Sequence, residues 1–240
     1  MVGVLYALAC ALSWAAGSVS MKNLSKKLDP FTLNAPRALV GGIALLILAS
    51  ATGRTSGAQD LSPQALALMV GSMALGGGVG DSLYVTSMAL IGVSRAYPIS
   101  CTYPAITLVL AALLLNEPIT PAVVAGMVLV IGGVMLISRP SSTDSRPTSA
   151  RAHRTGVALA LLAAACWAGA SIILSPATEG VDPILVSAVR LPALALIFWG
   201  LVGLRGTAGT LRTLSRKEWL TISLGGLVGM GVGSLLFVVA

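Results

Sequence analysis

Asp81 is the one acidic residue that lies deep inside an apolar stretch of this 240-residue sequence, within the segment GGGVGDSLY. A carboxyl group is costly to bury in such surroundings, and there it commonly carries a proton or contacts a cation. The structural alternative is an ion pair with Arg37 or a hydrogen bond to a Tyr or Ser side chain. Asp81 is therefore the first candidate for proton transfer or cation binding.

Arg37 and Arg190 each stand about two helical turns into an apolar stretch. A guanidinium group there could contact an anionic group of a substrate. The alternative, which we favour on general grounds, is that each side chain extends to a membrane interface and keeps its charge in water.

The run Gly78-Val79-Gly80-Asp81 also spells GxGD, the pattern of an intramembrane aspartyl protease. That chemistry needs a second aspartate that shares a proton with the first. The remaining aspartates all fall in or beside the connections between apolar stretches: Asp29, Asp60, Asp144 and Asp182. We therefore predict no enzymatic activity. No motif indicates a metal ion or an organic cofactor.

The composition predicts the class of protein that holds these residues. The chain is 56% hydrophobic and only 10% charged, with a mean hydropathy of +0.92. Apolar runs of about 20 residues recur along it, which is typical of an all-α polytopic membrane protein embedded in a lipid bilayer. The net charge of +7 is then explained by basic connections at the membrane surface, and we predict no nucleic-acid partner.

Eight membrane-spanning helices are expected, and one polar linker interrupts them. The linker, residues 140–154, is rich in Ser, Thr, Pro and Arg. The spans are placed from the apolar runs and the Pro and Gly punctuation at residues 2–21, 31–50, 64–90, 94–115, 119–138, 155–174, 184–204 and 218–240.

The fourth of these helices lies in the segment Ser94–Thr120 and carries Pro98 and Pro104 in its first half. Proline removes a backbone donor and clashes with the preceding turn, so we expect a kink. In a bilayer such a helix marks a transport site, because protein or a water-filled cavity must satisfy the freed carbonyls. Glu117 ends the apolar run and is a candidate for contact with a substrate or a coupling ion. The alternative, which we favour, is that it caps a helix beginning at Pro118.

Four aromatic residues are candidates for lining a cavity. Trp14 and Trp167 could line one or could simply pack, and packing is the more general role of a large aromatic side chain. Tyr97 and Tyr103 flank the prolines of the fourth helix and could present their hydroxyl groups to a substrate.

The Lys and Arg residues of the connections lie almost entirely on one side of the membrane in this arrangement. Connections 1–2, 3–4, 5–6 and 7–8 hold nearly all of them, and connection 2–3 holds Arg54 alone. Basic connections stay in the cytoplasm. The odd-numbered connections are therefore expected in the cytoplasm and the N-terminus outside.

An internal repeat organises the chain. Residues 3–87 align with 156–240 without a gap, and 22 of these 85 positions are identical, including Trp14 with Trp167 and Arg37 with Arg190. The unit is five helices, an odd number, so the two copies must insert in opposite orientations. We expect a first repeat at 1–139 and a second at 155–240. The second is incomplete, because residues 88–139 have no counterpart after Ala240.

The five-helix repeat, the Trp in its first helix and the proline-bearing helix ending in Glu117-Pro118 resemble the drug/metabolite transporter (DMT) superfamily, EamA type. The resemblance covers one full repeat and part of a second. It implies ten helices in two inverted halves, of which about eight are present here, and export or exchange of small metabolites. The last two helices of that pattern are missing, and the basic connections lie opposite to the side expected of many members.

The sequence therefore predicts a secondary transporter or exporter of a small metabolite or drug-like compound in the plasma membrane. It would work by alternating access between the inverted repeats, either driven by a proton or ion gradient or as a simply facilitative carrier. Two alternatives remain: the GxGD protease, which lacks a second intramembrane aspartate, and a scaffold or inactive fragment that transports nothing.

Overall fold

A computed structural model describes residues 2–137 and 149–240. The chain divides into two compact units. Unit 1 contains Met1–Ala74 and Ile173–Ala240, and unit 2 contains Leu75–Ile172. Every regular element of the described residues is a helix.

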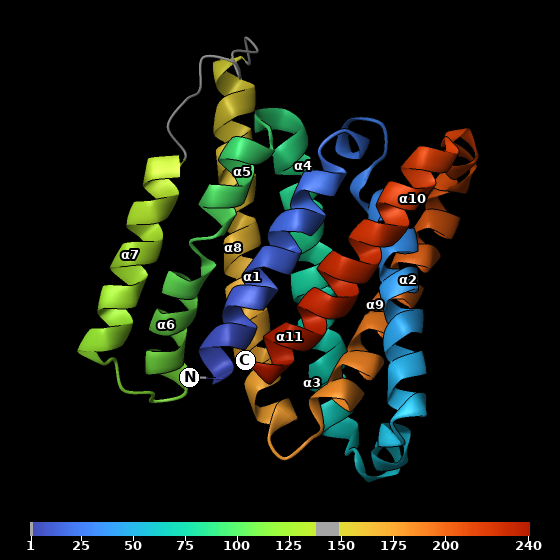
Figure 1. The fold of residues 1–240 in the computed structure, drawn as a ribbon. Coiled ribbons are helices and arrows are strands. Elements are labelled where there is room, and N and C mark those ends of the chain that lie inside the picture. The colour runs from blue at the N-terminus through green and yellow to red at the C-terminus, as the bar shows by residue number, and fades with distance from the viewer. Residues whose placement is uncertain (1, 138–148) are drawn as a thin grey trace. The chain divides into compact units, whose positions relative to one another are not determined.

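Unit 1 is built around α2 (Pro30–Ala51) and α9 (Pro183–Arg205), which run side by side (Figure 1). Their shared core includes Leu45, Leu191 and Phe198. Glycine lets the helices approach closely, since a methyl group at Gly42 would lie 3.2 Å from the backbone nitrogen of Pro192. The other helices of this unit are α1 (Val2–Met21), α3 (Pro63–Met73), α10 (Arg216–Gly225) and α11 (Gly233–Val239).

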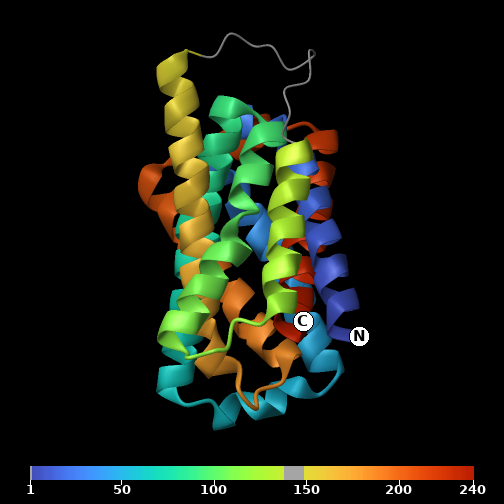
Figure 2. The same cartoon turned by 90° about the vertical axis from the view of Figure 1, so that its left-hand side faces the viewer.

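Unit 2 contains α4 (Asp81–Ile91), α5 (Val93–Ser100), α6 (Tyr103–Leu114), α7 (Pro121–Ile137) and most of α8 (Ala150–Thr178). Serine hydroxyls hold two of these helices to α8. Ser87 donates to the carbonyl of Gly156 at 2.7 Å, and Ser100 donates to that of Ala160 at 3.3 Å. Figure 2 shows how the chain changes direction between α5 and α6.

Two π-helical segments interrupt the long helices, and the sequence did not predict either. One is η3 (Ala74–Gly80), between α3 and α4, and the other is η6 (Gly226–Val232), between α10 and α11. Both fall in the glycine-rich runs that align in the internal repeat. A π-helical turn widens the helix locally and is frequent at functional sites.

The helix ends also recur at the spacing of the repeat. Asp29 caps α2 and Asp182 caps α9, each accepting bonds from two backbone N–H groups. Gly53 and Gly206 follow α2 and α9 with φ of +71° and +66°, a conformation that favours glycine. After them come the short 3-10 helices η2 (Arg54–Asp60) and η5 (Thr207–Thr213). These matching ends support the repeat.

Two ion pairs relate the ends of the helices in unit 1. Lys27, before α2, pairs with Glu218 in the first turn of α10. Arg54, after α2, pairs with Asp182 before α9, with 2.9 Å between Nη1 and Oδ2. Connection 1–2 therefore lies at the same end as connection 7–8, and connection 2–3 lies with connection 6–7. Equivalent connections of the two copies are at opposite ends, as inverted repeats require.

The prediction of an all-α polytopic membrane protein is confirmed. Among the residues that the structure describes, seven helical segments are long and apolar enough to cross a bilayer, and α7 is a shorter apolar helix. Of the predicted linker, 140–154, residues 140–148 lie outside the described residues. The last residues of this linker belong to α8, which begins at Ala150. The sequence predicts the start of this helix at residue 155. Only Gly92 separates α4 from α5, and Arg95 belongs to α5.

Candidate functional site

The side chain of Asp81 meets an indole inside unit 2. Asp81 is the first residue of α4, immediately after the π-helical η3, and is half-buried. Trp167 of α8 donates its Nε1–H to Oδ1 of Asp81 at 3.0 Å. An indole N–H is a neutral donor, so it stabilises the carboxylate without cancelling its charge. Two residues that the sequence singled out separately thus form one contact.

Glycines of η3 make this contact possible. A methyl group at Gly80 would lie 2.8 Å from Cδ1 and Nε1 of Trp167. At Gly76 it would lie 2.9 Å from the methyl group of Ala170. Because the glycines carry no side chain, α8 lies directly on the backbone of η3 and the indole reaches Asp81.

Three tyrosines complete what we call the Trp167 cluster: Trp167, Tyr84, Tyr97 and Tyr103. The rings of Tyr84 and Tyr103 lie 5.5 Å and 6.0 Å from that of Trp167, and Tyr97 lies 6.4 Å from Tyr84. Tyr103 meets the indole edge-on at 86°, a preferred aromatic geometry. The rings pack on one another, and the indole among them contacts the carboxylate of Asp81.

The break between α5 and α6 brings Tyr97 and Tyr103 to this cluster. Pro98 is buried inside α5, and Pro104 is exposed in the first turn of α6. Cys101 and Thr102 form a turn between the two helices. The break expected from the prolines is therefore present, and it places tyrosines from two different helices on the same indole.

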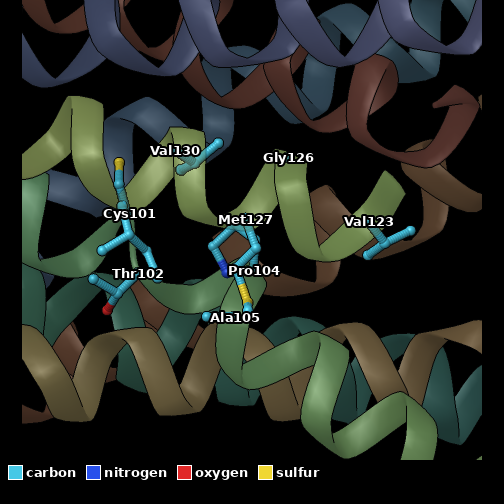
Figure 3. Close-up of a pocket in the computed structure, with 9 residues that line it drawn as sticks. Cys101, Thr102, Pro104, Ala105, Val123, Gly126, Met127 and Val130 are labelled. Carbon is cyan, nitrogen blue, oxygen red and sulfur yellow. The ribbon is translucent and has the colours of Figure 1, made fainter. Parts of the chain in front are cut away.

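An apolar hollow of about 200 Å³ lies beside the break, between α6 and α7. Figure 3 shows Pro104 of α6 and Met127 of α7 lining it, with Cys101 and Thr102 at one end. Its lining offers little polar chemistry beyond the Thr102 hydroxyl and the Cys101 thiol. The hollow suits hydrocarbon, from a lipid or from an apolar part of a solute.

The two predicted arginines are buried in unit 1. Arg37 of α2 keeps 4% of its surface exposed and Arg190 of α9 keeps 5%. Nη1 of Arg37 donates to Oδ1 of Asn34 at 2.6 Å. Neither side chain extends to an interface, so the interpretation that we favoured from the sequence is wrong for both.

Trp14 occupies the place in unit 1 that Trp167 has in unit 2. A methyl group at Gly233 would lie 2.6 Å from Cδ1 and Nε1 of Trp14, as one at Gly80 would from Trp167. The ring of Phe237 lies 5.5 Å away. Ser234, which is buried, aligns with Asp81. The indole therefore meets glycine in both copies, and the acid belongs to only one.

Glu117 is exposed in the non-helical stretch 116–120. The helix α7 begins at Pro121, and Oγ1 of Thr120 accepts from the backbone N–H of Val123 at 3.3 Å. The expectation that Glu117 caps a helix starting at Pro118 is therefore wrong, because Thr120 is the cap.

Sequence reasoning missed three residues: Tyr84, Asn34 and Ser187. Each lies three positions from a residue that had been singled out, which places it on the same helix face. Of the other aspartates, Asp29 and Asp182 are helix caps and Asp60 lies in η2, while Asp144 is outside the described residues. Within residues 2–137 and 149–240, no three His, Cys, Asp or Glu side chains gather to hold a metal ion.

A family model matches more than half of the chain. Residues 1–139 match the EamA-like transporter family. The chain is 31% identical over 150 residues to the uncharacterized transporter YvbV of Bacillus subtilis, covering 60% of this chain and 47% of that protein. It is 29% identical over 191 residues to an uncharacterized transporter of Archaeoglobus fulgidus, covering 80% and 65%. It therefore spans about half to two-thirds of the length of these relatives.

A solved crystal structure of a protein shares the fold. The TM-score is 0.67 at 19% sequence identity, and the match covers 99% of this chain and 78% of the other. At this identity the likeness concerns the fold alone.

Proposed function

Since the chain belongs to the EamA-like transporter family, we propose that it is a secondary transporter that moves a small metabolite by alternating access. The family and the apolar helices make it a multi-pass membrane protein. The solute, the coupling and the location in the plasma membrane are parts of the proposal. So are the repeat boundaries, 1–139 and 155–240, joined by the linker 140–154.

The contact between Asp81 and Trp167 carries the proposal. Ionisable side chains inside membrane spans are rare and mark ion pathways and proton relays. Nε1 of Trp167 lies 3.0 Å from Oδ1 of Asp81, so protonation of the carboxyl group would weaken a charge-assisted hydrogen bond between α4 and α8. Proton binding would then change how firmly these two helices are held together.

Helix interruptions supply the places where the protein would move. The π-helical η3 ends at Gly80, directly before Asp81, and α5 breaks before α6 at Cys101 and Thr102. Interrupted helices are common at the sites of secondary transporters. Both interruptions lie next to the Trp167 cluster, so a change in its hydrogen bonding would act where the helices bend most easily.

A proteoliposome assay with a pH indicator inside tests the coupling. A panel of amines, sugars and carboxylates is added outside, and empty liposomes report passive acid entry. We expect at least one solute to cause protein-dependent proton movement, and Asp81→Asn to abolish it while the protein stays folded. The matched control, Asp60→Asn, makes the same chemical change at an exposed residue of η2 and should keep the movement. Unchanged proton movement in Asp81→Asn would remove Asp81 from the coupling role.

A further inference from the structure

The two copies of the repeat hold their buried arginine differently. In α2, Arg37 donates to Asn34, three residues earlier. In α9 the corresponding residues are Arg190 and Ser187. Nε and Nη1 of Arg190 and Oγ of Ser187 are all enclosed, and none has a hydrogen-bond partner in the described part of the chain. The serine does not take over the role of the asparagine.

The charge of Arg190 is also uncompensated within the described residues. Val186 and Leu194, one turn before and after it on the same face of α9, are fully buried and apolar. The ion pairs of unit 1 join Lys27 to Glu218 and Arg54 to Asp182, and no carboxylate described in the structure pairs with Arg190. A guanidinium group does not lose its proton in proteins, so this charge remains.

A buried guanidinium group with two unsatisfied nitrogens, one turn from an unsatisfied serine hydroxyl, lowers the stability of the empty protein. Such a group is retained where a ligand supplies what is missing. The missing partner must carry negative charge for the guanidinium and a hydrogen-bond acceptor for the serine hydroxyl. A carboxylate has both, with two oxygens that accept several hydrogen bonds.

We propose that Arg190 and Ser187 form a subsite for a carboxylate group of the solute, an inference that rests on the transport function proposed above. One positive charge balances one negative charge, so a carboxylate leaves the pair neutral in its apolar surroundings, whereas a phosphate dianion leaves excess charge there. Arg37 already donates a hydrogen bond to Asn34 of the same helix. The two matched arginines thus have different roles.

Thermal unfolding of the purified full chain in detergent tests the subsite without a transport assay. The probes are benzoate and its neutral isostere benzamide, with inorganic phosphate as a second anion. A ligand that binds the folded state raises the unfolding midpoint. We expect benzoate to raise it for the wild-type protein, benzamide to leave it unchanged and phosphate to raise it less than benzoate.

Variants identify the residues responsible. Arg190→Gln should weaken benzoate binding about 10- to 100-fold, the range for a hydrogen bond to a charged group, and Ser187→Ala roughly 2- to 10-fold. Arg190→Lys, which keeps the charge, should retain part of the binding. Without ligand, Arg190→Gln should unfold at a higher temperature than the wild type, since it removes an uncompensated charge. Arg37→Gln should unfold at a lower temperature and keep its response to benzoate.

Equal benzoate stabilisation of the wild type and Arg190→Gln, or no stabilisation of the wild type, would overturn the subsite. A larger response to phosphate than to benzoate would overturn the choice of carboxylate. Proton movement in proteoliposomes together with either result leaves the transport function standing. If benzoate binds through Arg190 and no solute moves in the panel, the subsite holds and the transport function fails.

Discussion

At the scale of single residues, the Trp167 cluster joins a charged acceptor to a neutral donor. Asp81 and Trp167 lie 86 residues apart in the sequence and 3.0 Å apart in the structure. The indole contributes a hydrogen bond to the carboxylate and an aromatic surface to Tyr84 and Tyr103. These two contributions can be separated by substitution, because phenylalanine keeps an aromatic ring and loses the N–H.

Trp167→Phe should therefore lower the free energy of unfolding by about 1 kcal/mol, within the range of side-chain hydrogen bonds in membrane helices. Unfolding by sodium dodecyl sulfate in mixed micelles measures the change. Trp219→Phe is the matched control, because Trp219 stands in the first turn of α10 with 37% of its surface exposed. An equal loss in the two variants would mean that the bond to Asp81 contributes nothing to stability.

The sequence identified most of these residues but not their partners. Asp81 and Arg37 stand out because charge is rare inside apolar runs. Tyr84 and Asn34 do not stand out, since polar and aromatic residues are common there. Their importance follows from packing: Tyr84 meets an indole from α8, and Asn34 matters because Arg37 is too deeply buried to reach water.

At the scale of helices, close packing depends on where glycine lies. The indole of Trp167 rests directly on the backbone at Gly80, whereas a methyl group at Gly126 of α7 would meet nothing within 4 Å. The same residue type thus has opposite significance in two helices. At Gly80 it allows contact, and at Gly126 it only lowers the intrinsic helix propensity.

Gly80→Ala should reduce the free energy of unfolding by about 1–3 kcal/mol, the usual effect of overpacking. Gly126→Ala should leave it unchanged or raise it by up to about 1 kcal/mol, the gain in helix propensity. The detergent titration used for Trp167→Phe compares them directly. Equal tolerance of both substitutions would show that α8 does not depend on close contact at Gly80.

The break in the fourth helix could be predicted, but the π-helical segments could not. Pro98 and Pro104 predict the break directly, because proline lacks the N–H that a helix needs. A π-helical turn adds one residue to a helical turn and requires no particular side chain. The sequence therefore carries no residue pattern that predicts η3 or η6. The prediction that Glu117 is a helix cap was wrong because Thr120, directly before Pro121, accepts the capping hydrogen bond from the backbone N–H of Val123.

At the scale of the whole molecule, opposite orientation of the two copies is what alternating access requires. The odd number of helices in the repeat predicts it from sequence, and in unit 1 the pairs Lys27–Glu218 and Arg54–Asp182 support it by joining non-equivalent connections. Sequence could not reveal that the copies differ in how they hold their arginine. That difference depends on Asn34 and Ser187, which align in the repeat and bond differently.

Labelling of two matched cysteines tests the inverted arrangement most directly. Ser56 in η2 and Gly209 in η5 are equivalent positions of the repeat, and both are exposed. Each is changed to Cys after Cys10, Cys101 and Cys166 are replaced by Ala, and intact cells are treated with a membrane-impermeant maleimide. We predict that Ser56→Cys is labelled in intact cells and Gly209→Cys only after permeabilisation. Labelling of both positions from the same side would contradict inverted repeats, and with them alternating access between two opposed halves.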